Sequence, residues 1–198
     1  MSALHDRSQK GRHTILLLIL MTWLHGGNVF ANTEVPTDAF IQGFSVEVSN
    51  RTFALQAMKN LSKRSEGSKQ HTFWQAYLRL EQFNVPHYQA AALSWGLDSR
   101  PERLAKAKAF ATNLVPMAFM SLALRPLYAS TVKYAKKLRK LRLIGPTNAQ
   151  AFLNYMVEQE ELQVEMMRLA LRKDYAAAAR LVDEFIAKHT GTSFTSEQ

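Results

Sequence analysis

Two glutamates stand on helix faces that are otherwise apolar, and they have the clearest potential for chemistry in this sequence. Glu81 follows Trp74 and Tyr77 at helical spacing. Glu160 lies in the middle of a helix face rich in leucine, methionine and valine, with Gln163 beside it. A buried charge is costly unless it is paired, bound to a metal or neutralised. Both carboxylates therefore need a partner inside the fold.

Two hypotheses describe that partner. In the first, Glu81 and Glu160, together with Gln163 and His87, bind a metal ion or a small ligand between helices. Ferritin-like bundles bind metals with a Glu-x-x-His pair on each of two helices, and this sequence contains no such pair. In the second, the acids belong to a structural ion pair or hydrogen-bond network, which is the usual state of buried acids. Neither hypothesis predicts a particular metal or other cofactor.

Aromatic side chains are concentrated around Glu81 and could line a ligand pocket. The same stripe is also the pattern of an ordinary core, because aromatic side chains bury large areas. The candidate pocket residues are Trp74, Tyr77, Tyr88 and Trp95.

Catalytic motifs are missing from the sequence. It has no G-x-S-x-G elbow, no H-E-x-x-H pair and no phosphate-binding or dinucleotide glycine pattern. It also has no cysteine, which excludes thiol catalysis and cysteine-ligated zinc. No catalytic residue is assigned, and we expect a protein that is not an enzyme.

Residues 1–31 have the parts of a secretory signal peptide. A basic beginning is followed by the apolar stretch Ile15–Leu24, which is too short to cross a bilayer comfortably. Small or modest side chains then precede a cleavage position after Ala31. We expect export, most simply to a bacterial periplasm. An uncleaved anchor helix is the alternative.

The rest of the chain has helical periodicity and no strand-like alternation, so we predict an all-α single domain of six or seven antiparallel helices. This helical domain spans 44–190, between an N-terminal tail (32–43) and a flexible C-terminal tail (191–198). Proline at 86 and 126 is expected to interrupt the helices, and proline at 116 to kink or break one. The predicted helices are 44–64, 71–84, 86–96, 101–124, 128–143, 148–172 and 175–189.

Several helix starts carry capping residues. Ser99 with Glu102, and Thr147 with Gln150, have the spacing of a capping box. Asp174 is expected to cap the last helix. The stretch 170–189 has the pattern of one turn and helix of a tetratricopeptide-type hairpin. The pattern occurs once and without the repeat period that defines such proteins.

The chain has a formal net charge of +9, which favours anionic partners. For an exported protein nucleic acid is not expected among them. The charge is densest along one predicted amphipathic helix, which could bind an anionic surface. A solvated helix face is the alternative. The residues are Lys133, Lys136, Lys137, Lys140 and Arg142.

Just before this helix, residues 109–124 carry no charge, and Arg125 alone interrupts the run to residue 132. A membrane tether through 109–132 is therefore one alternative, although its prolines and Arg125 count against a span. Taken together, the sequence predicts an exported, non-enzymatic helical protein that binds a protein partner or an envelope component. The alternatives are a metal- or ligand-binding bundle and a membrane-tethered envelope protein. The oligomeric state has no sequence signal.

Overall fold

The computed structural model of the chain describes residues 34–97 and 117–194, with the backbone alone for 117–123. In these ranges five α-helices pack as a bundle and no strand forms, which confirms the all-α class. The signal peptide, the capping box at Ser99 and the effect of Pro116 lie outside them. The helices are α1 (Asp38–Arg64), α2 (His71–Ser94), α4 (Met117–Leu143), α5 (Gln150–Leu171) and α6 (Tyr175–His189), with a short 3₁₀ turn, η2 (Thr147–Ala149), before α5.

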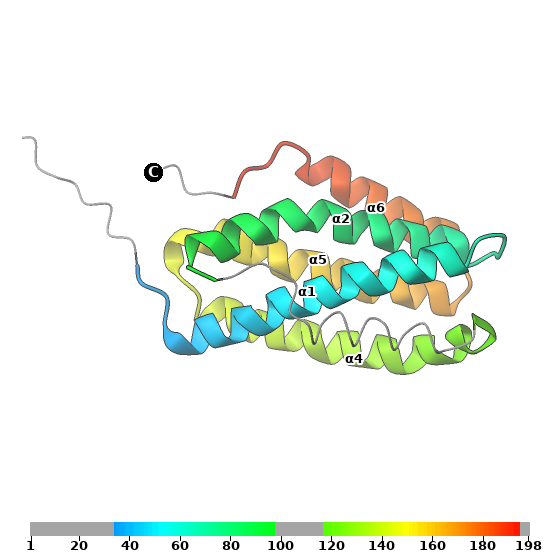
Figure 1. Cartoon of the computed structure of the whole chain (residues 1–198), viewed down its shortest axis with the longest axis horizontal. Helices are drawn as coiled ribbons and strands as arrows, with labels where there is room; N and C mark the ends of the chain where they lie inside the picture. Colours follow the sequence, from blue (N-terminus) through cyan, green and yellow to red (C-terminus); the bar gives the residue numbers. More distant parts are fainter. Residues whose placement is uncertain (1–33, 98–116, 195–198) are drawn as a thin grey trace, which may run out of the picture. The chain divides into compact units, whose positions relative to one another are not determined.

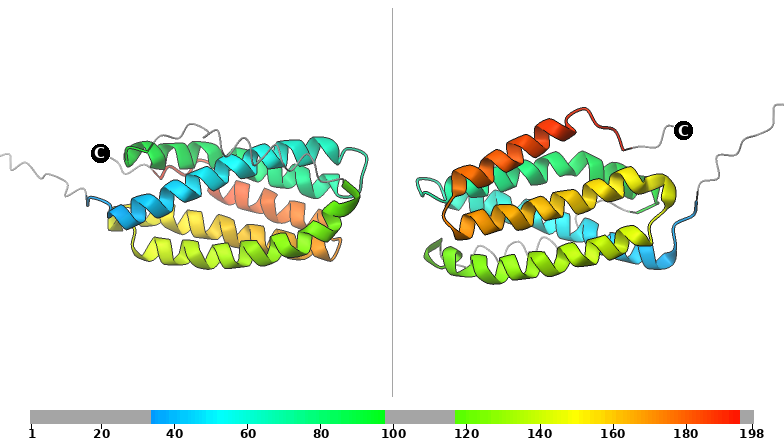
Figure 2. Two further views of the ribbon diagram at one scale, coloured as in Figure 1. Left: turned by 60° about the horizontal axis from the view of Figure 1, so that its bottom comes forward. Right: turned by 180° about the vertical axis from the view of Figure 1, so that it is seen from behind.

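The helices pack side by side in the order α1, α2, α6, α5, α4 (Figures 1 and 2). Fewer contacts join α1 to α4, and α2 also touches α5 across the bundle. Short connections make antiparallel hairpins of α1 with α2, α4 with α5, and α5 with α6. Four helices, α1, α2, α4 and α5, therefore surround a common interior.

Two predicted helix breaks are wrong. Pro86 lies inside α2 and Pro126 inside α4. A proline in a helix removes one backbone hydrogen bond and crowds the preceding turn. Both prolines are on the exposed side of their helices, where water can solvate the carbonyl group that loses its donor. The bundle contacts on the opposite side keep each helix continuous.

The helix starts differ from the predictions in two places. α1 begins at Asp38, six residues earlier than expected, because the Thr37 side chain accepts a hydrogen bond from the N–H of Phe40 at 3.2 Å. No capping box forms at Thr147. Its N–H and hydroxyl groups donate instead to Oε2 of Glu34, at 2.6 and 2.5 Å. The predicted cap of α6 is confirmed, since Asp174 accepts from the N–H of Ala177 at 3.1 Å.

Aromatic rings fill the interior at the end of the bundle where α1 begins. Phe44 stacks on Phe40 and on Tyr88, and it meets Phe152 edge-on at 5.7 Å. The connection between α4 and α5 passes close by, because a Cβ on Gly145 would lie 2.9 Å from the Phe40 ring. This apolar layer packs directly beside a buried polar cluster.

Candidate functional site

Arg51 of α1 lies at the centre of the bundle with carboxylates around it. Nη1 binds Oε1 of Glu81 on α2 at 3.0 Å, and Nη2 binds Oε2 of Glu160 on α5 at 3.1 Å. Nε lies 3.1 Å from Oε1 of Glu47, at the distance of an ion pair but without the alignment of a hydrogen bond. The three acids are at most 2% exposed. One guanidinium therefore joins α1, α2 and α5.

Amide side chains extend this network. Gln163 donates to Oε1 of Glu81 at 3.1 Å and to Oε1 of Gln159 at 2.8 Å. Gln159 also accepts from Arg51 at 3.2 Å and from Asn84 at 3.1 Å. The amide groups thus form hydrogen bonds with polar atoms that the ion pairs leave unbonded, as a buried polar network requires.

Tyrosine hydroxyl groups close the network at its edges. Tyr88 and Tyr134 both donate to Glu47, at 2.9 and 2.5 Å. Tyr77 donates to the amide oxygen of Gln163 at 2.7 Å, and Tyr155 donates to that of Asn84 at 2.6 Å. The two oxygens of Glu47 thus accept hydrogen bonds from α2 and α4, and the Arg51 guanidinium of α1 lies beside one of them.

Burial controls the protonation of the other two acids. It raises the pKa of Glu81 to about 7, although the charge of Arg51 acts to lower it. Burial also raises the pKa of Glu160, again against Arg51 and with Glu47 adding to the rise. For Arg51 the order is reversed: burial lowers its pKa, but three carboxylates raise it well above the usual value. Near neutral pH the cluster therefore holds protons that the unfolded chain would release.

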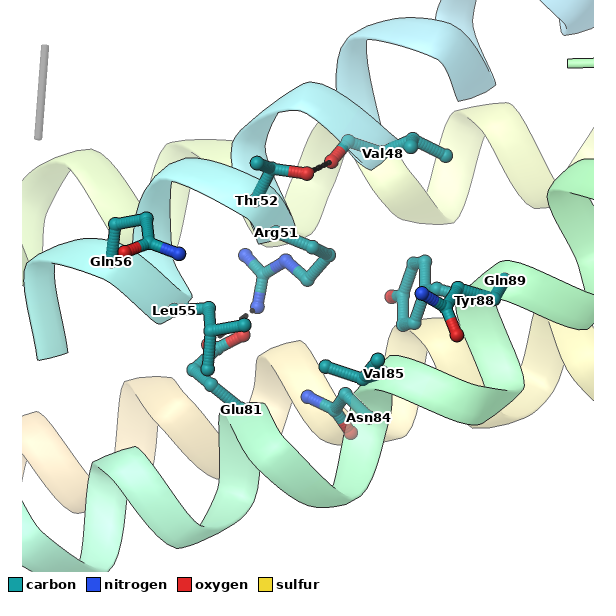
Figure 3. Close-up of a pocket in the computed structure, with 10 residues that line it drawn as sticks. All are labelled: Val48, Arg51, Thr52, Leu55, Gln56, Glu81, Asn84, Val85, Tyr88 and Gln89. Carbon is teal, nitrogen blue, oxygen red and sulfur yellow. Dashed lines mark hydrogen bonds and ion pairs between the residues drawn. The ribbon is translucent and has the colours of Figure 1, made fainter. Parts of the chain in front are cut away.

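A pocket of about 110 Å³ opens between α1 and α2 and reaches this network (Figure 3). Arg51 points across it toward Glu81. Aliphatic side chains form much of its wall, and amide side chains lie at its rim. The lining residues are Val48, Arg51, Thr52, Leu55, Gln56, Glu81, Asn84, Val85, Tyr88 and Gln89.

Three of the four predicted ligand residues come together. Glu81, Glu160 and Gln163 belong to the network around Arg51, whereas His87 does not. The His87 ring is half-buried and packs instead against Tyr155 and other aromatic groups. Burial lowers the pKa of His87, as does nearby His189.

The guanidinium of Arg51 stands between the acids, where a metal ion bound by them would have to lie. Within the described residues no three histidines or acids are grouped to hold a metal. The arrangement is that of the ion-pair network which the sequence suggested as the alternative.

The predicted pocket aromatics have different positions. Tyr88 lines the pocket, and Tyr77 is in the network behind it. Trp74 is fully buried in the core, and Trp95 packs edge-on against Phe44 at 4.7 Å. Neither tryptophan is among the pocket-lining side chains.

Arg51 and Glu47 belong to the buried network but were not predicted from the sequence. Glu47 and Arg51 stand one turn apart on the same face as Phe44 and Leu55. An i,i+4 pair of opposite charges normally indicates a solvated face. Here the pair lies on the apolar face of its helix, and this position was the sequence feature that indicated burial of both side chains.

The predicted basic surface lies along the outside of α4. This helix carries seven lysines and arginines and no acid. Lys133, Lys136, Lys137 and Lys140 are exposed, and none of them pairs with a carboxylate in the part of the chain that is described. Arg142 is partly buried and donates to Asn154 at 3.2 Å. In the described part of the chain, the four lysines are thus exposed and without an acidic partner.

Two exposed aliphatic residues continue the row of lysines. Leu143 is 77% exposed and Ile144 is 50% exposed. At roughly 100° per residue, Leu143 at the end of α4 falls in the same sector of the helix as the lysines, and Ile144 follows in the turn after it. No helix among the described residues is long and apolar enough to span a membrane. Residues 109–116 of the suggested tether are not among them.

Comparison with known proteins gives no family: no protein-family model, no curated protein and no solved structure matches the chain.

Proposed function

We propose that the protein is an exported, non-enzymatic helical protein that binds the anionic surface of an envelope membrane through α4. The observation that carries this proposal is the row of lysines that pair with no acid among the described residues and that ends in exposed Leu143 and Ile144. A basic helix with an adjoining apolar edge is the pattern of an interfacial helix. The surface and an anionic bilayer are complementary in charge.

The position of this surface supports a membrane rather than an acidic protein. Glu34 binds Thr147, so the chain enters the domain beside the end of α4. In the sequence the apolar stretch Ile15–Leu24 ends ten residues before Glu34. As part of a signal peptide, this stretch is expected to bring the chain to the envelope, where anionic lipid is at hand.

The strength of such binding follows from the number of lysines. A basic side chain near an anionic leaflet contributes about 1 kcal/mol. Four lysines give about 4 kcal/mol, enough for reversible binding that weakens as salt screens the charges. Insertion of Leu143 and Ile144 adds an apolar contribution that salt does not screen.

Changing Lys133, Lys136, Lys137 and Lys140 to glutamine is expected to weaken binding to phosphatidylglycerol vesicles by on the order of 100-fold or more. Co-sedimentation at low salt measures this. The matched control changes Lys59, Lys63, Lys69 and Lys173, which are exposed in the last turns of α1 and in the connections that follow α1 and α5. The control has the same net charge and should retain most of the binding. Equal losses in the two variants, or no binding by the unchanged protein, would reject the proposed surface.

Changing Leu143 and Ile144 to serine tests the apolar part. We expect about a 30-fold loss of vesicle binding that persists at high salt, because each of the two side chains would lose about 1 kcal/mol of apolar burial. The control changes Val46 and Leu93, which are exposed on α1 and α2. A loss that disappears at high salt would instead place these two residues outside the bilayer.

A further inference from the structure

The α1–α2 pocket contains an acceptor that no described residue satisfies. Oε2 of Glu81 is buried and accepts no hydrogen bond in the described part of the chain, while Oε1 accepts from both Arg51 and Gln163. The neighbouring Asn84 amide acts to lower the pKa of Glu81, but it donates to Gln159. Glu81 is 1% exposed and is one of the residues that line the pocket. A buried acceptor without a donor costs about 1–3 kcal/mol. The pocket therefore offers an unused binding position for a hydrogen-bond donor.

The walls of the pocket determine which kind of side group a ligand can have beyond its hydrogen-bond donor. Val48, Leu55 and Val85 are aliphatic and partly exposed to the opening, and Gln56 and Gln89 lie at its rim (Figure 3). A volume of about 110 Å³ has room for a short chain and not for a large ring system. The site thus suits a small molecule with an apolar stem and one polar end.

The charge of the cluster decides the sign of that polar end. Three carboxyl groups surround one guanidinium, so once Glu81 and Glu160 are ionised an entering anion would add to an acidic excess. A cation would offset it. The attraction of Arg51 for an anion is already used by Glu47, Glu81 and Glu160. A donor with a positive charge also makes a stronger hydrogen bond to a carboxylate than a neutral donor does.

We propose that the α1–α2 pocket binds a small primary alkylammonium ion. Its NH₃⁺ group pairs with Oε2 of Glu81, and its stem lies along Val48, Leu55 and Val85. When Glu81 carries a proton, that proton leaves to solvent as the ammonium group enters. The neutral acid and the cation thus become a carboxylate–ammonium pair and a released proton, and charge is conserved.

This exchange makes binding depend on pH. The charged and titratable groups that act on Glu81 are Glu47 and Arg51 from α1, Tyr77 from α2, and Tyr155 and Glu160 from α5. Tyr88 from α2 and Tyr134 from α4 donate to Glu47 instead. Burial raises the pKa of each tyrosine, so all four stay neutral near pH 7. Because the pKa of Glu81 is about 7, the affinity should rise about tenfold between pH 6 and pH 8.

Calorimetric titration of the full chain with n-butylammonium tests the proposal, with n-butanol and butyrate as matched probes. We expect saturable binding of the ammonium ion at pH 8, and binding at least about tenfold weaker for the other two. Titration at pH 6 in two buffers of different ionisation enthalpy should show close to one proton released. Equal affinity for butanol, or no release of a proton, would overturn the proposal.

The variant E81Q separates the pocket from the remainder of the network. Glutamine keeps an oxygen for Arg51 and Gln163 but cannot form the anion, so ammonium binding should fall about 10- to 100-fold. The control E160Q removes an equally buried acid that does not line the pocket and should still bind. Wild-type affinity in folded E81Q would overturn the proposal. If E81Q does not fold, the pH dependence and proton release of the unchanged protein decide it.

Discussion

Replacing Arg51 with methionine is expected to lower the free energy of unfolding by about 3–5 kcal/mol at pH 8, the range found when one partner of a buried ion pair is removed. The three carboxyl groups that share Arg51 are almost completely buried, so none can turn to water without disrupting the helices. Methionine fills much of the same space. The loss therefore measures the missing charge more than a missing volume. Urea unfolding followed by circular dichroism gives the difference.

The matched control for this experiment is Arg79→Met. Arg79 pairs with Asp183 across α2 and α6, and the two side chains are 40% and 60% exposed. Such pairs contribute about 0–1 kcal/mol. The Arg51 variant should also regain stability at pH 5, because protonated acids no longer need a counter-charge. A loss of similar size in both variants, or one that is independent of pH, would show that the buried charges are not the cause.

The stability of the unchanged protein should fall as the pH rises from 5 to 8. Burial raises the pKa of Glu81 from 4.5 to about 7, and it raises that of Glu160 as well. Between the unfolded and folded pKa values the folded state binds more protons than the unfolded state. The free energy of unfolding therefore decreases with pH in this window. At about 1.4 kcal/mol per pKa unit, Glu81 alone contributes about 3 kcal/mol to the decrease.

The double variant E81Q/E160Q isolates this effect. It should be more stable than the unchanged protein at pH 8, and its stability should depend much less on pH. Glu66 and Glu184, both exposed, provide the control pair for the same substitution. His87 acts in the opposite direction at acid pH, because its lowered pKa favours the neutral ring, but it is common to all variants. Unfolding curves that coincide for the double variant and the unchanged protein would contradict the assignment.

Local patterns predicted most of the helices, and the failures have physical causes. The apolar periodicity located the five described helices, but proline was given too much weight as a helix breaker. Pro86 and Pro126 face outward, and the packing of the opposite face holds α2 and α4 together. Sequence alone does not show which side of a helix the bundle covers. The start of α1 was also missed, because Phe40 and its neighbours before Phe44 were assigned to a tail.

The candidate site was predicted in part. The inward positions of Glu81 and Glu160 follow from helical spacing, and the structure brings both to one cluster. Their shared partner, Arg51, could not be identified by periodicity, because the contact joins residues 30 and 109 positions apart in the sequence. The pocket depends on how α1 and α2 are placed side by side. No pattern within either helix contains that information.

The network around Arg51 also restricts how this sequence can change over time. Any single replacement of the arginine leaves several acids without a counter-charge, whereas a fully apolar version of the cluster would be tolerated, as buried ion pairs elsewhere can be. Sequences that are intermediate between the charged cluster and a fully apolar one are expected to be the least stable. The effects of substitutions here should therefore be strongly non-additive. The lineage can leave this arrangement only by several changes together, so Arg51 and its acids should be inherited as one unit.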